Sequence, residues 1–377
     1  MKRDRITLTG KPGDKTMVNA GVKDPMLHGN KLRSEDFNYE LPQEKVAEYP
    51  VEPRDQSRMM VVNRREDNLE HIEHKKFIDL PEYLHEGDIL VVNNTRVYPA
   101  ILTAVKEDTG DEVQVFLLRE LQANIWDVEI DPINKARIGN NLSLGEDLDC
   151  EIVDNTAANE RVIRFYENRN EVQEALERTG QMPLPPYIQR NPEPEDKQHY
   201  QTVFAKVPGA VAAPSAALHF TDSLLESLRE KGVETVELTL HLRFDAHYPV
   251  TISDLSRYQM QPEYYDIDAE TVRKINEVRR KGGRVIAASA SVARALESSH
   301  FQNQLMEPKQ HWTDLFIYPP HRFTIVDGLI SNFHQPQSTT LMLQSAFYNT
   351  GNMISAYKEA RDRDYRFLSF GDSMLLL

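Results

Sequence analysis

The chain has 377 residues, which is long for a single hydrophobic core, so its length favours two domains. It carries 44 Lys and Arg residues against 59 Asp and Glu residues, and the net charge of −15 excludes a broad basic surface for nonspecific polyanion binding while leaving room for a local basic groove. The sequence has no long apolar run, which predicts no membrane span, and no secretory signal, which predicts a cytoplasmic protein. Cys150 is the single cysteine, so we expect neither an internal disulfide nor a cysteine-based metal cluster.

The first 98 residues divide into an irregular and a regular part. Residues 1–34 have no periodicity, so we predict a loosely ordered N-terminal extension. From Asp36 onward we expect a short helix, a proline-bounded loop, a strand at residues 59–63 and then an apolar strand in GDILVVNNTRVYPAIL. Arg96 follows that strand, where it could bind a carboxylate or phosphate with two hydrogen bonds, or form a salt bridge that ties two domains together.

Residues 99–168 have a different pattern. Short alternating runs (EVQVFLL, IWDVEI, LDCEIV and RVIRFY) are separated by turn-forming segments rich in Gly, Asn and Asp. Several short strands at this spacing predict a small antiparallel β-barrel. We therefore predict a barrel domain at 99–168, inserted into a core domain made of residues 35–98 and 169–377.

The rest of the chain alternates between helices and strands. NEVQEALERTG, DSLLESLREKG, DAETVRKINEVRRKGG, SVARALESS, STTLMLQSAFYN and NMISAYKEARDRD are predicted helices. VETVELTLHL, RVIAASA, TDLFIYP and FTIVDGLISNF are predicted strands. This alternation predicts the fold class α/β, a layered core with a largely parallel sheet, interrupted by the small antiparallel barrel.

Three strand-to-helix junctions are candidate ligand sites, because open α/β sheets bind ligands beyond the carboxyl ends of their strands, where helix N-termini present free N–H groups. Serine and threonine at these positions are equally typical of ordinary helix caps. The junction residues are Ser289 and Ser291 in the first, Asn332, His334 and Ser338 in the second, and the segment APSAALHFT up to Thr221 in the third.

Several titratable residues are candidates for chemistry, each with a structural alternative. His219 and His334 lie near predicted helix starts, where the helix dipole lowers an imidazole pKa and keeps the ring neutral. Glu263 lies among aromatic residues, where a buried carboxyl suits proton transfer, although a solvated glutamate beside core tyrosines fits as well. His241 and His247 are six residues apart and are expected on one face of a strand, but no metal-ligand spacing appears, so we predict no metal.

A series of ordered motifs resembles one family, the S-adenosylmethionine:tRNA ribosyltransferase-isomerases of queuosine biosynthesis. The matching segments include DFNYELPQEKVAEYPVEPRDQSRMMVV, GDILVVNNTRVYPAIL, MPLPPYI, YQTVFAKVPGAVAAPSAALHFT, KGVETVELTLHL, MQPEYYDI, GGRVIAASASVARALES, VDGLISNFH, STTLMLQSAF and YRFLSFGDSM. Together they span about residues 36–377, nearly the whole chain.

The resemblance implies both a fold and a reaction. The fold is an α/β domain interrupted by a small β-barrel. The reaction moves the ribosyl part of S-adenosylmethionine, the donor, onto the aminomethyl group of a 7-deazaguanine in the tRNA anticodon region, so that epoxyqueuosine forms and adenine and methionine leave. The sulfonium acidifies the neighbouring ribose C–H, so a positioned base can begin the rearrangement without a metal. We expect S-adenosylmethionine and tRNA as partners, no membrane and, in the favoured case, a monomer.

The resemblance also suggests site residues. His219 and Glu263 are the expected groups for proton handling. The substrate-lining candidates are Asn94, Arg96, Phe220, Arg294, Asn332, His334, Ser338 and Asp372. RNA contact is expected on a basic strip, for which a solvated helix face is the alternative: Lys274, Arg279, Arg280 and Lys281.

The chain departs from the usual family pattern at predicted pocket junctions. RFDAH replaces a glycine-rich segment at Arg243–His247, Gln261 and Pro262 stand where a histidine is usual, and SASVAR lacks a glycine and a threonine. Added side chains change the space near a ligand. Two other functions therefore stay open at this point: a donor-dependent transfer to another acceptor, and a noncatalytic nucleoside- or RNA-binding protein.

Overall fold

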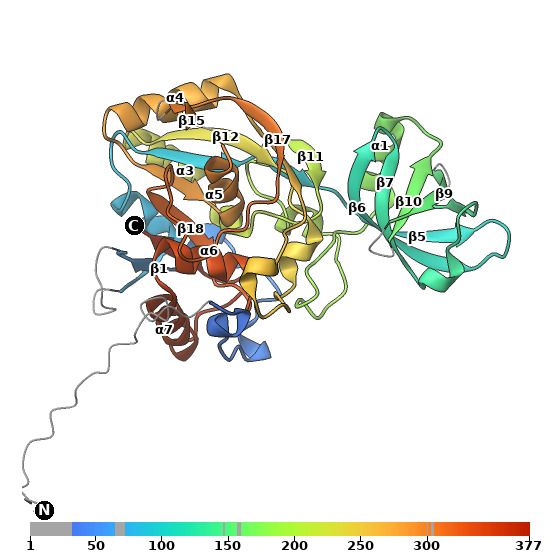
Figure 1. Ribbon diagram of the computed structural model, residues 1–377, viewed down its shortest axis with the longest axis horizontal. Coiled ribbons are helices and arrows are strands. Elements are labelled where there is room, and N and C mark those ends of the chain that lie inside the picture. The colour runs from blue at the N-terminus through green and yellow to red at the C-terminus, as the bar shows by residue number, and fades with distance from the viewer. Residues whose placement is uncertain (1–31, 65–71, 146–147, 157–159, 300, 303–304) are drawn as a thin grey trace, which may run out of the picture.

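The computed structural model describes residues 32–64, 72–145, 148–156, 160–299, 301–302 and 305–377. A large α/β body and a smaller β-barrel lie side by side, and extended segments join them (Figure 1). Of the predicted N-terminal extension, residues 1–31 lie outside the described part, whereas Leu32 and Ser34 are buried against the large body.

A nine-stranded sheet forms the middle layer of the large body, in the order β17-β13-β12-β3-β14-β18-β19-β1-β2. Strands β12, β3, β14 and β18 run parallel, which confirms the α/β prediction, while antiparallel pairs lie mainly toward the edges. The strand bounds are β1 Arg58–Val62, β2 Glu73–Lys76, β3 Ile89–Asn93, β12 Glu234–Leu240, β13 Glu263–Ile267, β14 Val285–Ala288, β17 Lys309–Thr313, β18 Gly328–Asn332 and β19 Ser373–Leu376.

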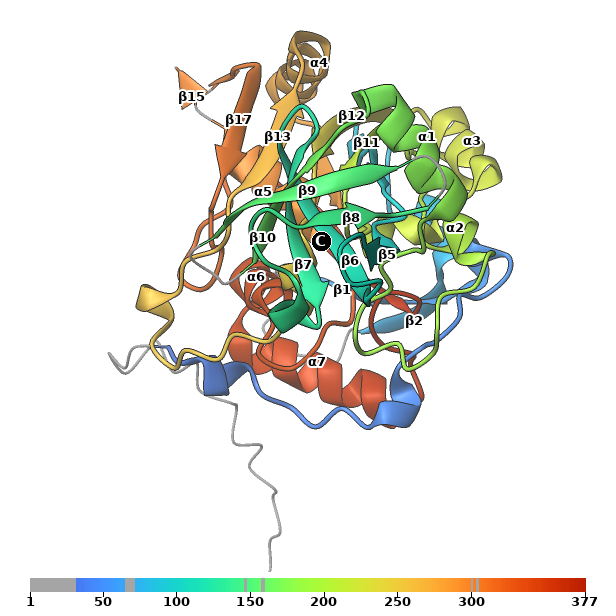
Figure 2. The same ribbon diagram turned by 90° about the vertical axis from the view of Figure 1, so that its right-hand side faces the viewer.

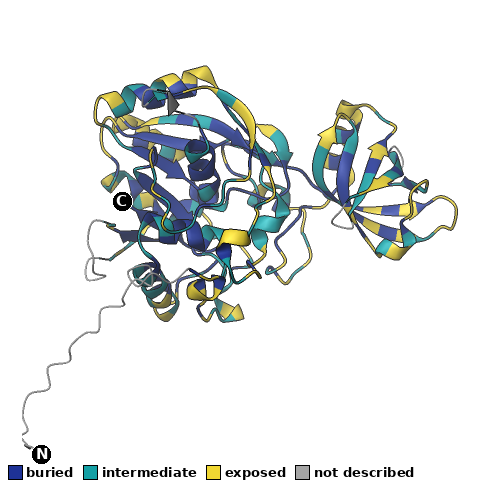
Figure 3. Cartoon of the chain, in the orientation of Figure 1, coloured by how far each residue is buried: buried dark blue, intermediate teal, exposed yellow. Residues whose placement is uncertain are grey.

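Helices cover the two faces of this sheet. Alternate residues of β1 and β3 enter two different apolar clusters, as the period of two in a strand requires. One cluster receives side chains from helices α4 Ala269–Arg280, α5 Ala290–Glu297, α6 Thr339–Phe347 and α7 Thr350–Asp362. The other receives side chains from α3 Asp222–Glu230. The central strands are buried throughout while the outer faces of the helices are exposed (Figure 3).

Side-chain caps begin most of these helices, as the sequence predicted. Thr221, Asp268, Ser338 and Asn349 each accept a hydrogen bond from a backbone N–H in the first turn of α3, α4, α6 and α7. Among the described residues, no helix combines the length and the apolar character needed to cross a membrane.

Six antiparallel strands close into the barrel in the order β10-β7-β6-β5-β8-β9 (Figure 2). Alternate residues of each strand point into its core, as in Ile101–Lys106. Their bounds are β5 Ile101–Lys106, β6 Glu112–Gln122, β7 Ile125–Asp131, β8 Asn141–Ser143, β9 Asp149–Asn155 and β10 Arg161–Phe165. The predicted barrel is confirmed.

Helix α1, Arg169–Thr179, packs on the barrel. Its apolar residues Val172, Ala175 and Leu176 belong to the same buried cluster as the barrel strands. The predicted domain boundary at residue 168 therefore separates α1 from its packing partner, and the domain limits stay a prediction.

The remaining elements are short. These are β4 Thr95–Val97, β11 Val207–Ala210, β15 Phe301–Gln302, β16 Leu305–Met306, helix α2 Asp196–His199 and short 3-10 segments at Ser34–Phe37, Gln43–Lys45, Arg54–Gln56, Phe77–Glu82, Ile133–Lys135, Ser215–His219, Phe244–His247 and Leu255–Arg257.

Three local predictions were wrong. The expected helix before residue 50 is only a three-residue turn, Gln43–Lys45. The segment TDLFIYP leaves the sheet after Thr313, where β17 ends. His247 does not share a strand face with His241, because β12 ends at Leu240 and a 3-10 turn follows.

Candidate functional site

A cleft of about 310 Å³ lies between the barrel and the carboxyl end of β12, and we call it the interdomain cleft. Parallel strands commonly place ligand-binding groups at this end. The barrel side contributes Leu118, Arg119 and Glu120 of β6 and Arg169 of α1; the sheet side contributes Pro208 and Gly209 of β11, His241, Leu242 and Arg243 after β12, Pro262, Glu263 and Tyr264 at β13, and Trp312 of β17.

Glu263 forms a buried ion pair at the floor of this cleft. One carboxylate oxygen pairs with the guanidinium of Arg294, and the other accepts the backbone N–H of Arg243 at 2.9 Å. Arg294 Nε donates to the Leu315 carbonyl at 3.0 Å. Two predicted site residues, Glu263 and Arg294, are therefore brought together, and loss of either one would leave an uncompensated buried charge.

His241 also lines the sheet side of the cleft. Its Nδ1 is 2.8 Å from the Thr95 hydroxyl, and its ring stacks on Tyr264 with the centroids 5.8 Å apart. Burial is the main cause that lowers the pKa of His241 to about 4, and the nearby charge of Arg169 adds to it. The ring is thus neutral at neutral pH and available for hydrogen bonding or proton acceptance.

Three arginines give the cleft positive charge. Arg169 pairs with Glu120 at 2.8 Å, and Arg119 pairs with Asp127 at 2.6 Å. The side chain of Arg243 makes no hydrogen bond to any described residue, although its Nε and Nη1 are buried. With the exposed ring of Trp312, the cleft combines cations, carboxylates and aromatic faces, which suits a charged ligand that carries a flat ring.

His219 lies outside the cleft, in a buried network. Its Nε2 is 3.0 Å from Asn332 Oδ1, and its Nδ1 is 2.7 Å from the Ser57 hydroxyl. The Asn332 amide nitrogen donates to the carbonyls of Leu368 and Ser369, so its oxygen faces the ring, and we assign the proton to Nε2. Burial lowers the pKa of His219 to about 4. Both ring nitrogens are occupied by protein partners, and the role of His219 in proton transfer stays a prediction.

Five other candidates hold the scaffold. Asn94 bonds to two side chains of β12, His334 to a hydroxyl of β18, and Ser338 caps α6. Burial lowers the pKa of His334 to about 3. Asp372 accepts two backbone N–H groups. The ring of Phe220 is fully buried against two phenylalanines, and its role as a substrate-lining residue stays a prediction.

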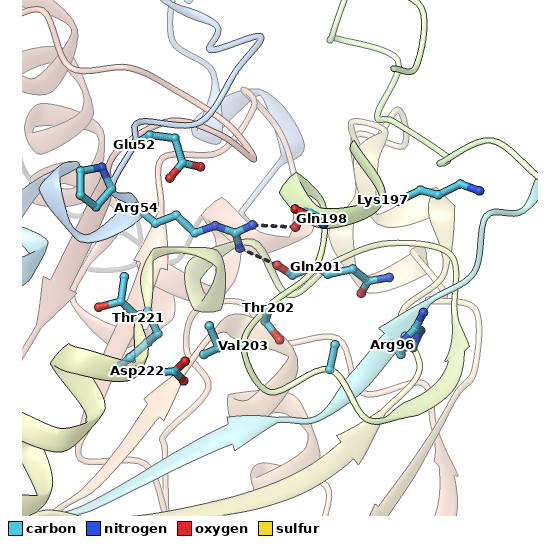
Figure 4. Close-up of a pocket in the computed structure, with 13 residues that line it drawn as sticks. Glu52, Arg54, Arg96, Lys197, Gln198, Gln201, Thr202, Val203, Thr221 and Asp222 are labelled. Carbon is cyan, nitrogen blue, oxygen red and sulfur yellow. Dashed lines mark hydrogen bonds between the residues drawn. The ribbon is translucent and has the colours of Figure 1, made fainter. Parts of the chain in front are cut away.

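A second, more open cavity of about 600 Å³ lies near α2 and contains Arg96 (Figure 4). The guanidinium of Arg54 spans it and donates to two backbone carbonyls in the segment 198–201. Arg96 pairs with Glu177 of α1 at 2.9 Å, which is the salt bridge between the two bodies that the sequence left as an alternative. Both cations already have protein partners here.

Two of the four residues of the predicted basic strip, in α4 and at its end, form ion pairs. Lys274 lies 2.8 Å from Glu234, and Lys281 lies 2.8 Å from Glu277. Arg279 donates to a backbone carbonyl at residue 324. These contacts favour the alternative of a solvated helix face, and RNA binding by this strip stays a prediction.

Most of the cleft was not among the predicted site residues. Arg119 and Arg169 come from the barrel side, and Trp312 comes from an edge strand that the sequence did not reveal. Two signals did point here: the unusual Arg243 and the histidine at 241. Their significance depends on which chain segments the fold places opposite them.

Comparisons with known proteins agree over nearly the full chain. The family model for "Queuosine biosynthesis protein" matches residues 34–376. The chain is 47% identical to the S-adenosylmethionine:tRNA ribosyltransferase-isomerase of Chloroherpeton thalassium and 44% identical to that of Flavobacterium psychrophilum, each over 92% of this chain and 100% of the relative. The crystal structure of S-adenosylmethionine tRNA ribosyltransferase from Thermotoga maritima, at 34% identity, covers 91% of this chain and 100% of its own, with a TM-score of 0.50.

Proposed function

Because the chain belongs to the queuosine biosynthesis protein family, we propose that it is an S-adenosylmethionine:tRNA ribosyltransferase-isomerase and that its chemistry takes place in the interdomain cleft. The enzyme transfers and isomerises the ribosyl moiety of the donor onto 7-aminomethyl-7-deazaguanine in tRNA, which gives epoxyqueuosine and releases adenine and methionine. The observation that carries this assignment is the 47% identity to a relative that is covered over its whole length.

The composition of the cleft supports its role as the donor site. A sulfonium cation needs a nearby carboxylate, and Glu120 and Glu263 both line the cleft. An adenine ring needs a flat partner, which Tyr264 and Trp312 supply. The volume of about 310 Å³ lies at the lower end of the range for small-molecule pockets.

Two groups in the cleft are suited to moving the proton that starts the rearrangement. Glu263 was predicted for this role from the sequence, and its carboxylate lies at the cleft floor. His241 is neutral and partly buried, and no described residue hydrogen-bonds to its Nε2. We propose that these two residues handle protons, whereas His219 supports the fold around Asn332.

The place at which the tRNA acceptor binds is proposed from the exposure of one aromatic ring at the cleft. We propose that the anticodon region of tRNA approaches the exposed mouth of the cleft, where Trp312 is 46% exposed and can stack on an unpaired base. We also expect the protein to act in the cytoplasm as a monomer.

The assignment is tested by turnover of the purified protein. Incubation with S-adenosylmethionine and tRNA that contains 7-aminomethyl-7-deazaguanine should release adenine and yield epoxyqueuosine, both followed by mass spectrometry. Glu263→Gln should lower kcat by about 100- to 10,000-fold, because a positioned proton-transfer group contributes this much. The matched control is Glu151→Gln, which removes a carboxylate from the barrel surface.

Three results would contradict the proposal. The first is no adenine release under conditions in which the Chloroherpeton thalassium relative turns over. The second is adenine release without tRNA modification, which would indicate another acceptor. The third is RNA binding without consumption of the donor, which would indicate a noncatalytic binding protein.

A further inference from the structure

Arg243 is a buried cation whose guanidinium has no hydrogen-bond partner among the described residues. Its side chain is 11% exposed, and its Nε and Nη1 are both shielded from solvent. The carboxylate of Asp245 lies 3.5 Å from Nε, too far and too poorly aligned for a hydrogen bond. Because an arginine stays charged at every pH of interest, these donors are costly to leave unmatched.

The surroundings of Arg243 supply one anion, Asp245, in a loose ion pair that leaves the buried Nε and Nη1 without a hydrogen bond. Glu263, the nearest carboxylate of the cleft, already pairs with Arg294 and accepts the backbone N–H of Arg243. Glu120 on the opposite wall pairs with Arg169. Both carboxylates of the cleft lining therefore pair with other arginines, and the unbonded N–H donors of Arg243 remain for an anion that enters the cleft.

Arg119 strengthens this part of the cleft as an anion subsite. Its Nη2 bonds to Asp127, while its buried Nε has no partner among the described residues. Its guanidinium carbon lies 5.7 Å from the centre of the Trp312 ring. Guanidinium donors from both walls of the cleft thus lack partners, one from the barrel and one from the sheet.

We propose that Arg243, assisted by Arg119, binds the α-carboxylate of the methionyl half of S-adenosylmethionine. This inference rests on the proposed function. A carboxylate takes two parallel hydrogen bonds from a guanidinium. The same end of the donor carries an ammonium and a sulfonium, and the cleft lining also holds the carboxylates of Glu120 and Glu263, each of which shares its charge with one arginine of the protein. A phosphate of tRNA has no positive group and would face those carboxylates.

The test compares two ligands on one protein. Calorimetric titration of the wild type should give tighter binding of S-adenosylmethionine than of its decarboxylated analogue by about 10- to 100-fold, the equivalent of a lost hydrogen bond to a charged group. In Arg243→Gln this ratio should fall close to one. In Arg243→Lys it should be intermediate, because lysine keeps the positive charge but lacks the two parallel N–H donors of the guanidinium. Both ligands are titrated into the same preparation of each variant. A partly unfolded fraction therefore affects both titrations equally and cancels in the ratio of the two affinities.

The control is Arg164→Gln, which removes an exposed arginine of the barrel that pairs with Glu151. It should keep the wild-type ratio. Retention of that ratio by Arg243→Gln, with adenine release intact in the wild type, would overturn this inference alone. Loss of tRNA affinity in Arg243→Gln with an unchanged ratio would also overturn it and identify a phosphate as the anion. Failure of the wild type to bind the donor would overturn the proposed function as well.

Discussion

At the scale of single residues, Gly209 decides how the cleft is built. A Cβ atom on this residue would lie 2.4 Å from Cε1 and Nε2 of His241 and 2.6 Å from its Cδ2. The imidazole therefore rests directly on the glycine backbone, held by Thr95 on one side and by Tyr264 on the other. The small residues of KVPGAVAAPSAALHFT serve the protein's own packing, and at Gly209 they make room for a side chain of the cleft.

Gly209→Ala should displace the ring of His241. We expect a loss of about 1–3 kcal/mol of stability, as for other overpacked sites, and a fall in kcat/KM of about 10- to 100-fold from the misplaced ring. Urea unfolding and steady-state kinetics measure the two effects. In the His241→Ala background the contact with the ring is gone, so the added methyl should cost only the backbone strain of a non-glycine residue at φ +158°. An equal cost in both backgrounds would refute this account.

At the scale of elements, the start of α5 is strained. Ser289 has φ +146° and ψ 164°, a region of backbone space that is essentially restricted to glycine. Its hydroxyl accepts the N–H of Val292 at 3.2 Å and lies 2.7 Å from the Ser291 hydroxyl. Helix α5 carries Arg294, so the strained turn sets the position of the arginine that pairs with Glu263.

Ser289→Gly should stabilise the protein. Relief of the backbone strain is worth about 1–3 kcal/mol, while loss of the serine cap to glycine costs only a few tenths of a kcal/mol. Ser289→Ala is the matched control: it loses the cap and keeps the strain, so it should destabilise by about 1 kcal/mol. Urea denaturation midpoints give both values, and a midpoint for Ser289→Gly below that of the wild type would show that the turn is not strained.

At the scale of the whole molecule, four neutral histidines make stability depend on pH. Burial lowers the pKa of His219, His241 and His247 to about 4 and that of His334 to about 3. The unfolded chain, with ordinary histidine pKa values near 6.5, binds more protons than the folded chain in this range. Stability is therefore lost as the pH falls from about 6.5 toward 4, where the folded state begins to protonate.

The contribution of one histidine is measurable. Between pH 6 and pH 4.5, His219 should contribute about 1.4 kcal/mol per pH unit to the slope of unfolding free energy against pH. His219→Gln should lower stability at pH 7 and flatten this slope, whereas His85→Gln, a change at an exposed position, should leave it unchanged. Urea unfolding at several pH values provides the test. An unaltered slope in His219→Gln would mean that the ring is not kept neutral by burial.

The strand and helix alternation, the inserted barrel and most helix caps could be predicted from the sequence, because each rests on local periodicity and local hydrogen bonds. The edge strands could not. Glu73–Lys76 and Lys309–Thr313 are polar segments with little apolar alternation, and they become strands only because a neighbouring strand offers a hydrogen-bonding edge.

The sequence by itself thus determined the fold class, the family and one member of the cleft, Glu263, together with its ion-pair partner Arg294. Only the tertiary structure decided that Arg119 of the barrel, Arg243 of the sheet and Trp312 of an edge strand line one cleft. The physical reason is that these residues lie on segments nearly 200 positions apart. Their meeting depends on how the closed barrel sits against the end of β12, which no local pattern specifies.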